Sequence, residues 1–465
     1  MTLTLTTAPA AQTAREKALP RERRDRWPLL PLLPLLPLLP LLPLLATVLL
    51  VALPADGTET GSVSGVRAAD LLSGVAVLVC AGRLLFLRRR PLTTAAAVVL
   101  GLPAVGIALA TVTAADPVAA LPGFVRYLQI FVLVPAAVLL LVRDARGFRA
   151  VAGAVVLLAA VQGATGVHQY LTGSGASYMG EDVRAVGTFG PGDVMGMATV
   201  VGYGLVAATA YALRAPAGAP RPLRAWALAA AALLVVPLAL SFSRGAWIAT
   251  AAGALAVIAL TGLRQAVRAL AVLGAAGVVL VGGFGVGSEM ISQRLTSITE
   301  VTSTPDRSVN DRYTMWAAAT GMWREHPATG VGLKGFPAHR DAHASIGLSA
   351  GSDTAGAGQE FRKQPLLSPH NMYLLVLSEQ GLIGFTALAG SWAALLVGGV
   401  RRLVLARARG AAAVDCGLAA VGLMTWQTVD FLYADIGGPS TVLTGIVLGL
   451  AAWWALSEPE RATAA

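Results

Sequence analysis

Long apolar blocks, separated by short loops that contain arginine, recur along almost the whole of this 465-residue chain. A helix needs about 20 apolar residues to cross the ~30 Å hydrocarbon core of a bilayer, and the blocks have this length. Only 13% of the residues are charged, about half of the usual share in soluble domains. The pattern is typical of a polytopic helical membrane protein. It argues against a soluble enzyme, a disordered scaffold and a repeat solenoid.

We therefore predict an all-α fold with about 12 transmembrane helices. The expected spans are 29–53, 70–87, 93–114, 124–142, 148–171, 194–213, 223–242, 244–262, 268–287, 371–399, 412–433 and 439–457.

The basic residues orient these spans. Apart from one long loop, the connections on one side hold only Arg67, Arg126, Arg184 and Arg244, whereas the other side holds most of the remaining arginines. Because cytoplasmic loops carry the excess of Lys and Arg, we expect both termini in the cytoplasm. The same loops account for the net charge of +10, so we expect no nucleic-acid partner.

The spans divide the chain into five parts. We expect a basic cytoplasmic tail (1–27), nine helices (28–287), a large extracytoplasmic loop (288–369), three helices (370–457) and a second cytoplasmic tail (458–465). Residues 28–43 repeat Leu-Leu-Pro, and proline disfavours a helix interior. This run is either a span or a signal-type segment, and both alternatives place Asp56 outside.

The large loop contains a helical pattern. Tyr313, Trp316 and Trp323 recur at helical spacing between residues 310 and 325. Ser308 and Asp311 resemble a capping box at the start, and His326-Pro327 ends the helix. We predict a short amphipathic helix that lies near the outer membrane surface.

Three arginines lie outside, close to the ends of spans. Arg244 stands in the sequence SFSRGAW between two apolar blocks, Arg312 begins the loop helix, and Arg184 precedes the sequence AVGTFG. Each is either an ordinary exposed or snorkelling arginine or a cation for phosphate, whose oxygens the planar guanidinium binds bidentately.

Further polar candidates surround the point where the long loop re-enters the membrane. His370 follows Pro369, which favours a helix start there, and is either a surface histidine or a general base near neutral pH. Glu379 and Asp430 lie inside apolar spans, near their outer halves. Either carboxylate orients an arginine or the histidine, or it satisfies a neighbouring group.

Two other motifs give weaker evidence of a functional site. The glycines of the G-x-G-x-x-G sequence at 330–335 lack a preceding strand, so we expect a turn and no dinucleotide site. His339 and His343 are four residues apart, a spacing that suits two zinc ligands if the segment is helical. The glutamate that accompanies such histidines in a metalloprotease helix is absent. Cys80 and Cys416 lie in apolar blocks. We expect no metal site.

The order of these pieces resembles the O-antigen ligase family, also called the O-antigen ligase/polymerase family. The resemblance rests on SFSRGAW (241–247), DRYTMWAAATGMWREHPATGVGLKGF (311–336) and PHNMYLLVLSEQGLIG (369–384). RAVGTFG (184–190) resembles the upstream outer-loop motif of the family, which usually continues toward Asn-Pro-Asn where this chain has Pro191-Gly-Asp193.

This resemblance implies a glycosyltransferase that takes a glycan from undecaprenyl diphosphate at the outer face of the plasma membrane. The family transfers the glycan to an acceptor hydroxyl without a nucleotide sugar, a required metal ion or another cofactor. Its essential histidine matches His370, and its essential arginines match Arg244 and Arg312. We expect Arg184, Asn371 and Tyr373 to join these arginines at the donor.

The implied partners are the polyprenyl-diphosphate-linked donor, a glycan, lipid or protein acceptor, and the lipid bilayer. A repeat-unit polymerase and a protein O-oligosaccharyltransferase of the same family are alternatives that these motifs do not separate. A 12-span transporter fits less well, because its long loop would be cytoplasmic and would follow the sixth span.

Overall fold

The computed structural model describes most of the chain. The described residues are 39–54, 68–87, 92–178, 183–190, 193, 195–216, 218–220, 222–278, 307–345, 348, 352–356, 362–364, 366–411, 413–438 and 440–457. All helices and strands described below belong to one unit of the chain, Pro40–Ala465.

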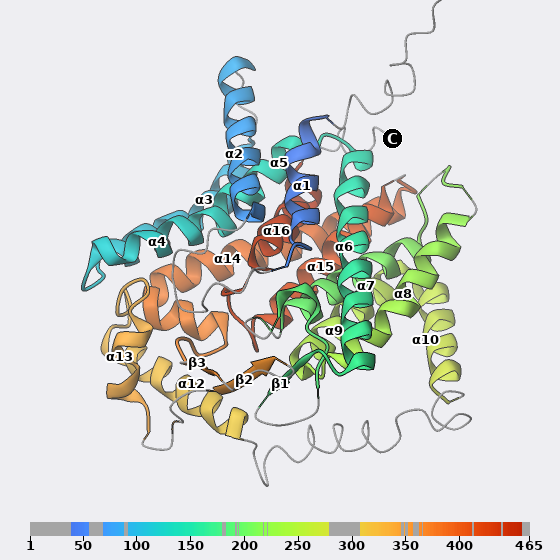
Figure 1. Cartoon of the computed structure of the whole chain (residues 1–465). Helices are drawn as coiled ribbons and strands as arrows, with labels where there is room; N and C mark the ends of the chain where they lie inside the picture. Colours follow the sequence, from blue (N-terminus) through green and yellow to red (C-terminus); the bar gives the residue numbers. More distant parts are fainter. Residues whose placement is uncertain are drawn as a thin grey trace, which may run out of the picture. The chain divides into compact units, whose positions relative to one another are not determined.

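Within the described residues, eight helices are long and apolar enough to cross a membrane (Figure 1). They are α2 (Ala68–Leu87), α3 (Thr94–Val112), the continuous rod Pro117–Leu141, α6 (Ala145–Thr172), α7 (Gly196–Leu213), α8 (Pro222–Leu240), α9 (Arg244–Thr261) and α14 (Met372–Ala408). The predicted all-α polytopic membrane fold is confirmed.

Four shorter helices occupy the other predicted spans. They are α1 (Leu42–Leu50), α10 (Leu263–Val278), α15 (Val414–Asp430) and α16 (Thr441–Leu456). Parts of the predicted spans 29–53 and 268–287, and most of the Leu-Leu-Pro run, lie outside the described residues. Twelve crossings and the five-part division therefore stay predictions.

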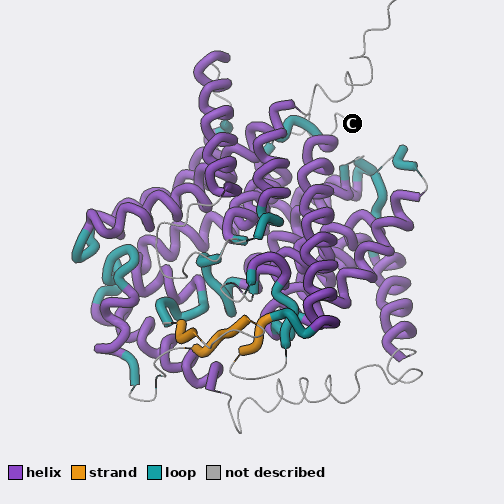
Figure 2. The backbone as a smooth tube through the Cα atoms, in the orientation of Figure 1, coloured by secondary structure: helices purple, strands orange, loops and turns teal. Residues whose placement is uncertain are grey.

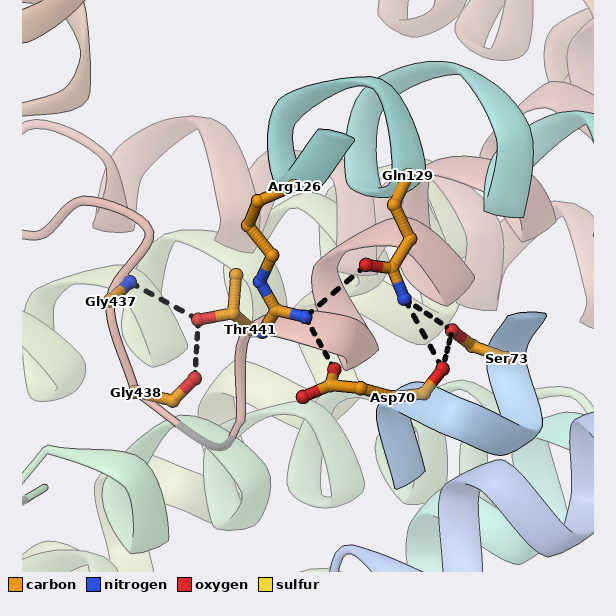
Figure 3. Close-up of polar contacts among 7 residues, drawn as sticks. All are labelled: Asp70, Ser73, Arg126, Gln129, Gly437, Gly438 and Thr441. Carbon is orange, nitrogen blue, oxygen red and sulfur yellow. Dashed lines mark hydrogen bonds and ion pairs between the residues drawn. The ribbon is translucent and has the colours of Figure 1, made fainter. Parts of the chain in front are cut away.

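The rod Pro117–Leu141 consists of α4 (Pro117–Leu128), the π-helix η2 (Gln129–Leu133) and α5 (Val134–Leu141). A polar network joins it to α2 (Figure 3). Arg126 forms an ion pair with Asp70, and the Gln129 amide donates to Ser73 Oγ at 2.6 Å. Arg126, one of the four arginines that we predict on the outer side, is thus paired with a carboxylate in the first turn of α2.

The interior of the bundle consists of α7, α15 and α16, whose residues are mostly buried. Small residues let these helices approach closely. A Cβ atom added to Gly202 of α7 would lie 2.5 Å from the indole nitrogen of Trp426 on α15. That nitrogen donates to Thr250 Oγ1 of α9 at 2.9 Å.

A small antiparallel sheet, which the sequence analysis did not predict, joins two outer loops (Figure 2). Strand β1 (Ala176–Tyr178) follows α6, whereas β2 (Ser352–Gly356) and β3 (Arg362–Gln364) belong to the large loop. The order is β1-β2-β3, with Ala176 opposite Gly356 and Ser352 opposite Gln364. The large loop is therefore attached to the α6–α7 connection.

The predicted loop helix is present as α12 (Arg307–Glu325), and it ends directly before His326-Pro327 as expected. Its start differs from the prediction. Ser308 lies inside the helix, because α12 already begins at Arg307, so the proposed capping box is wrong. The short helix α13 (Phe336–His343) follows it. The position of α12 near the membrane surface stays a prediction.

Candidate active site

His370 lies just before α14, in a backbone conformation that few side chains adopt. Its φ is 48°, in the left-handed region. The helix begins at Met372 and its N-cap is Asn371, so it starts three residues after Pro369 and does not include His370. The histidine instead lies on the bend that enters the helix, directly after Pro369.

Neighbouring elements fix this bend. The indole nitrogen of Trp316 on α12 donates a hydrogen bond to the carbonyl oxygen of Pro369 at 2.8 Å. On the other side, the amide of Met372 donates to the carbonyls of Phe431 and Ala434 at 2.9 and 3.0 Å. His370 is thus held between α12 and the α15–α16 connection (residues 431–440).

Asn371 and Tyr373 already have partners within the protein. Asn371 Oδ1 accepts from the amide of Leu374 at 3.0 Å, and its side-chain nitrogen donates to the carbonyl of Leu432 at 3.0 Å. The Tyr373 hydroxyl donates to the carbonyl of Thr428 at 2.8 Å. These contacts favour a positioning role for both residues, at the start of α14.

Two charged residues of opposite sign act on His370. Burial lowers the pKa of the imidazole below its usual value, the Coulombic effect of Asp435 opposes this, and Arg312 lowers it further. Arg312 comes from α12 and Asp435 from the α15–α16 connection. The structure therefore brings two predicted residues, His370 and Arg312, together with a carboxylate that the sequence analysis missed.

Arg244 and Arg184 occupy adjoining backbone segments. Arg244 is the first residue of α9, whose N-cap Ser243 accepts from the amide of Ala246 at 3.3 Å. Arg184 forms a β-bridge with Ala176, and the next amide, that of Ala185, donates to the carbonyl of Leu240 at 3.1 Å. Both arginine side chains are half-buried.

The α15–α16 connection touches several of these segments. A Cβ atom on Gly245, beside Arg244, would lie 3.0 Å from Cβ of Tyr433. Ser440 Oγ donates to the Asp193 carboxylate at 3.4 Å. Asp430, at the end of α15, is buried and interacts electrostatically with both Asp435 and Asp193. The starts of α7, α9 and α14 and the end of α15 thus lie around this connection.

Backbone strain is concentrated in the same region. Among the described residues other than glycine, φ is positive at Phe242, Lys334 and His370. Phe242 lies two residues before Arg244, and Lys334 lies in the glycine-rich segment after α12. Such conformations persist only where the surrounding structure enforces them, and they cluster at functional sites.

Helix α14 is broken about two and a half turns after its start. Gly381 has φ 61° and ψ −165° inside the helix. The four backbone groups that lose their helical partners bond to residues 327–332 instead. These bonds run from Val331 N to Ser378 O (2.9 Å), Gly332 N to Glu379 O (3.1 Å), Leu382 N to Pro327 O (2.9 Å) and Ile383 N to Ala328 O (3.2 Å).

The packing of residues 327–332 on α14 accounts for the glycine-rich motif at 330–335. Gly330 and Gly332 have φ of 69° and 93°, so the glycines form the expected turn, which packs on α14 without any nucleotide-binding strand.

His339 and His343 do share α13, but His343 Nε2 lies 3.0 Å from a Glu325 carboxylate oxygen. In the described part of the chain, no cluster of three His, Cys, Asp or Glu residues is arranged to hold a metal ion.

Glu379 lies directly before the break and is 1% exposed. Its Oε1 accepts from the amide of Phe336 at 3.2 Å. One of the two expected roles, satisfying a neighbouring group, is thus present. The second carboxylate oxygen, Oε2, has no hydrogen-bond partner within the described residues.

Residues 229–389 match the model of the O-antigen ligase family. This match confirms the resemblance seen in the sequence for this part of the chain. The matched region runs from α8 to the second part of α14 and contains Arg244, Arg312, His370 and Gly381. No curated protein matches the chain.

Two carboxylates of the candidate site, Asp193 and Asp435, lie outside the matched region. A sequence signal for Asp435 does exist. It follows Asp430 by five residues in the last outer connection, where a second carboxylate is unusual beside two apolar spans. Its link to His370, however, depends on a contact between segments 65 residues apart.

Proposed function

We propose that this protein transfers a glycan from undecaprenyl diphosphate to an acceptor hydroxyl at the outer face of the plasma membrane. The observation that carries the proposal is that the charges of Arg312 and Asp435 both act on the buried His370. A base and a phosphate-binding cation at one point are what a transfer from a diphosphate requires.

In this reaction, His370 removes the proton from the acceptor hydroxyl. The hydroxyl oxygen attacks the anomeric carbon of the donor, and the bond from that carbon to the diphosphate oxygen breaks. The diphosphate leaves with the electron pair, and the anomeric carbon is inverted. Asp435 stabilises the imidazolium that forms, because its carboxylate favours the protonated ring.

The arginines neutralise the leaving group. Negative charge grows on the diphosphate oxygens, and Arg312, Arg244 and Arg184 supply fixed guanidinium donors for them. Arg312 has a second effect, because its charge lowers the pKa of His370 and so favours the neutral ring, the form that accepts a proton. The apolar helices hold the polyprenyl tail, and the reaction uses no metal ion or other cofactor.

The decisive experiment compares His370→Ala with His326→Ala in transfer from a purified lipid-linked glycan. His326 is exposed at the end of α12 and serves as the matched control. Loss of a general base lowers the rate by about 10²- to 10⁴-fold, while donor binding changes little. Full transfer activity of His370→Ala would overturn the mechanism. A polymerase or a protein O-oligosaccharyltransferase would use the same residues with another acceptor.

A further inference from the structure

Two buried polar groups on the α4 side of the site have no hydrogen-bond partner within the described residues. They are the Tyr127 hydroxyl and Glu379 Oε2. Tyr127 is 0% exposed and Glu379 is 1% exposed. Buried polar groups are almost always hydrogen-bonded in native proteins. These two groups therefore have hydrogen-bonding capacity that the described part of the protein does not use.

The two groups belong to one cluster. Lys334 connects them, because its side chain packs on Gly123 of α4, and its Nζ lies 5.7 Å from the centre of the Tyr127 ring. The same lysine interacts electrostatically with Glu379. Its φ of 62° shows that the glycine-rich segment is held in a strained conformation at this point.

The cluster adjoins the reaction centre. Tyr127 interacts electrostatically with Glu379 and with Asp435, and Asp435 is also the carboxylate that acts on His370. A ligand that contacts Tyr127 and Glu379 therefore shares the electrostatic influence of Asp435 with His370.

Tyr127 is also held rigidly. The preceding residue, Arg126, is paired with Asp70, and the π-helix η2 begins two residues later, at Gln129 (Figure 3). Gln129 Nε2 reaches both Ser73 Oγ and the carbonyl of Asp70, at 2.6 and 3.3 Å. Single π-helical turns of this kind are frequent at functional sites.

The chemistry of the cluster fits sugar hydroxyls better than phosphate. A hydroxyl both donates and accepts hydrogen bonds, so it can donate to the Glu379 carboxylate and accept from Tyr127 or Lys334. A diphosphate would be repelled by the neighbouring carboxylates of Glu379 and Asp435. Phosphate therefore fits the arginines, and the sugar fits this cluster.

We propose that Tyr127 and Glu379, together with Lys334, form the subsite for the hydroxyl groups of the donor sugar whose anomeric carbon reacts. The inference rests on the proposed function. It assigns recognition of the sugar to α4 and the glycine-rich segment, apart from the arginines that hold the diphosphate.

The test compares Tyr127→Phe with Tyr211→Phe. Tyr211 of α7 is also buried and its hydroxyl also lacks a partner, but it lies beside the Arg149–Asp415 pair. Each variant loses one oxygen atom. The purified full-length proteins are assayed for binding of two probes, the lipid-linked glycan isolated from the source cells and undecaprenyl diphosphate without sugar.

We expect Tyr127→Phe to weaken binding of the lipid-linked glycan by about 3- to 10-fold, as the loss of one hydrogen bond does. Binding of undecaprenyl diphosphate stays unchanged, and so does binding of both probes to Tyr211→Phe. Thermal stability of Tyr127→Phe is equal or higher, since an unpartnered buried hydroxyl is removed.

Unchanged glycan binding by Tyr127→Phe overturns the subsite. Equal weakening for both probes overturns it as well, because the hydroxyl would then contact the diphosphate. Failure of the wild-type protein to bind either probe would instead contradict the proposed function, so the two failures are distinguishable.

Discussion

Trp316 holds Pro369 through one hydrogen bond, from the indole nitrogen to the carbonyl oxygen at 2.8 Å. This bond links α12, the amphipathic helix of the large loop, to the residue before His370. It makes the placement of the proposed base depend on a helix that lies about fifty positions earlier in the chain.

The first prediction concerns this bond. Trp316→Phe keeps an aromatic ring but removes the donor, so we expect kcat to fall about 3- to 10-fold, the effect of losing one hydrogen bond. Trp323→Phe is the control, because the Trp323 indole nitrogen has no hydrogen-bond partner in the described part of the chain. Equal rates for the two variants in the transfer assay would show that α12 does not position the base.

The second prediction concerns pH. The proposed base acts as the neutral ring, so kcat/KM falls as the pH drops through the pKa of His370, which lies below the ordinary value of about 6.5. Asp435 raises this pKa. Asp435→Asn therefore moves the acidic limb of the pH–rate profile to lower pH and lowers the maximal rate. A limb that moves to higher pH would contradict the assigned role of Asp435.

The third prediction separates a bidentate phosphate contact from simple charge at Arg244. Arg244→Ala and Arg244→Lys both lose most transfer activity, because an ammonium group does not reproduce the planar guanidinium. Arg409→Lys, at the exposed end of α14, is the control and keeps its activity. Near-normal transfer by Arg244→Lys would favour a snorkelling arginine instead.

The fourth prediction tests the orientation in the membrane. Single cysteines at Ser345 and Asp182 react with a membrane-impermeant thiol reagent in intact cells, whereas one at Ala408 does not. The native Cys80 and Cys416 are buried, so background labelling is low. Labelling of Ala408→Cys alone would place the proposed site in the cytoplasm and exclude the reaction at the outer face.

The fifth prediction concerns the break in α14. Gly381→Ala places a Cβ atom against the backbone of Ala328, at a φ of 61° that disfavours a side chain. We expect a loss of about 1–3 kcal/mol in the free energy of unfolding and a marked loss of transfer. Gly390→Ala, at an open position of the same helix, leaves the melting temperature equal or higher. Similar melting temperatures for the two variants would show that the break is not required.

The sequence predicts the helices well because each span needs only a local run of apolar residues. It also predicts α12, whose pattern and proline terminator are local. The sheet between β1 and β2 escapes such analysis, since Ala176 and Gly356 are distant in sequence. The same holds for Asp435 beside His370 and for Tyr127 beside Glu379, because each pair is formed by the packing of separate helices.

The break at Gly381 also has a consequence for biogenesis. Until residues 327–332 dock, four backbone groups of α14 lack the partners that a lipid environment does not supply. Residues 327–332 must therefore dock before α14 reaches its final form. Because His370 directly precedes that helix, the reactive site also forms only after this docking, which confines the proposed glycan transfer to fully assembled molecules.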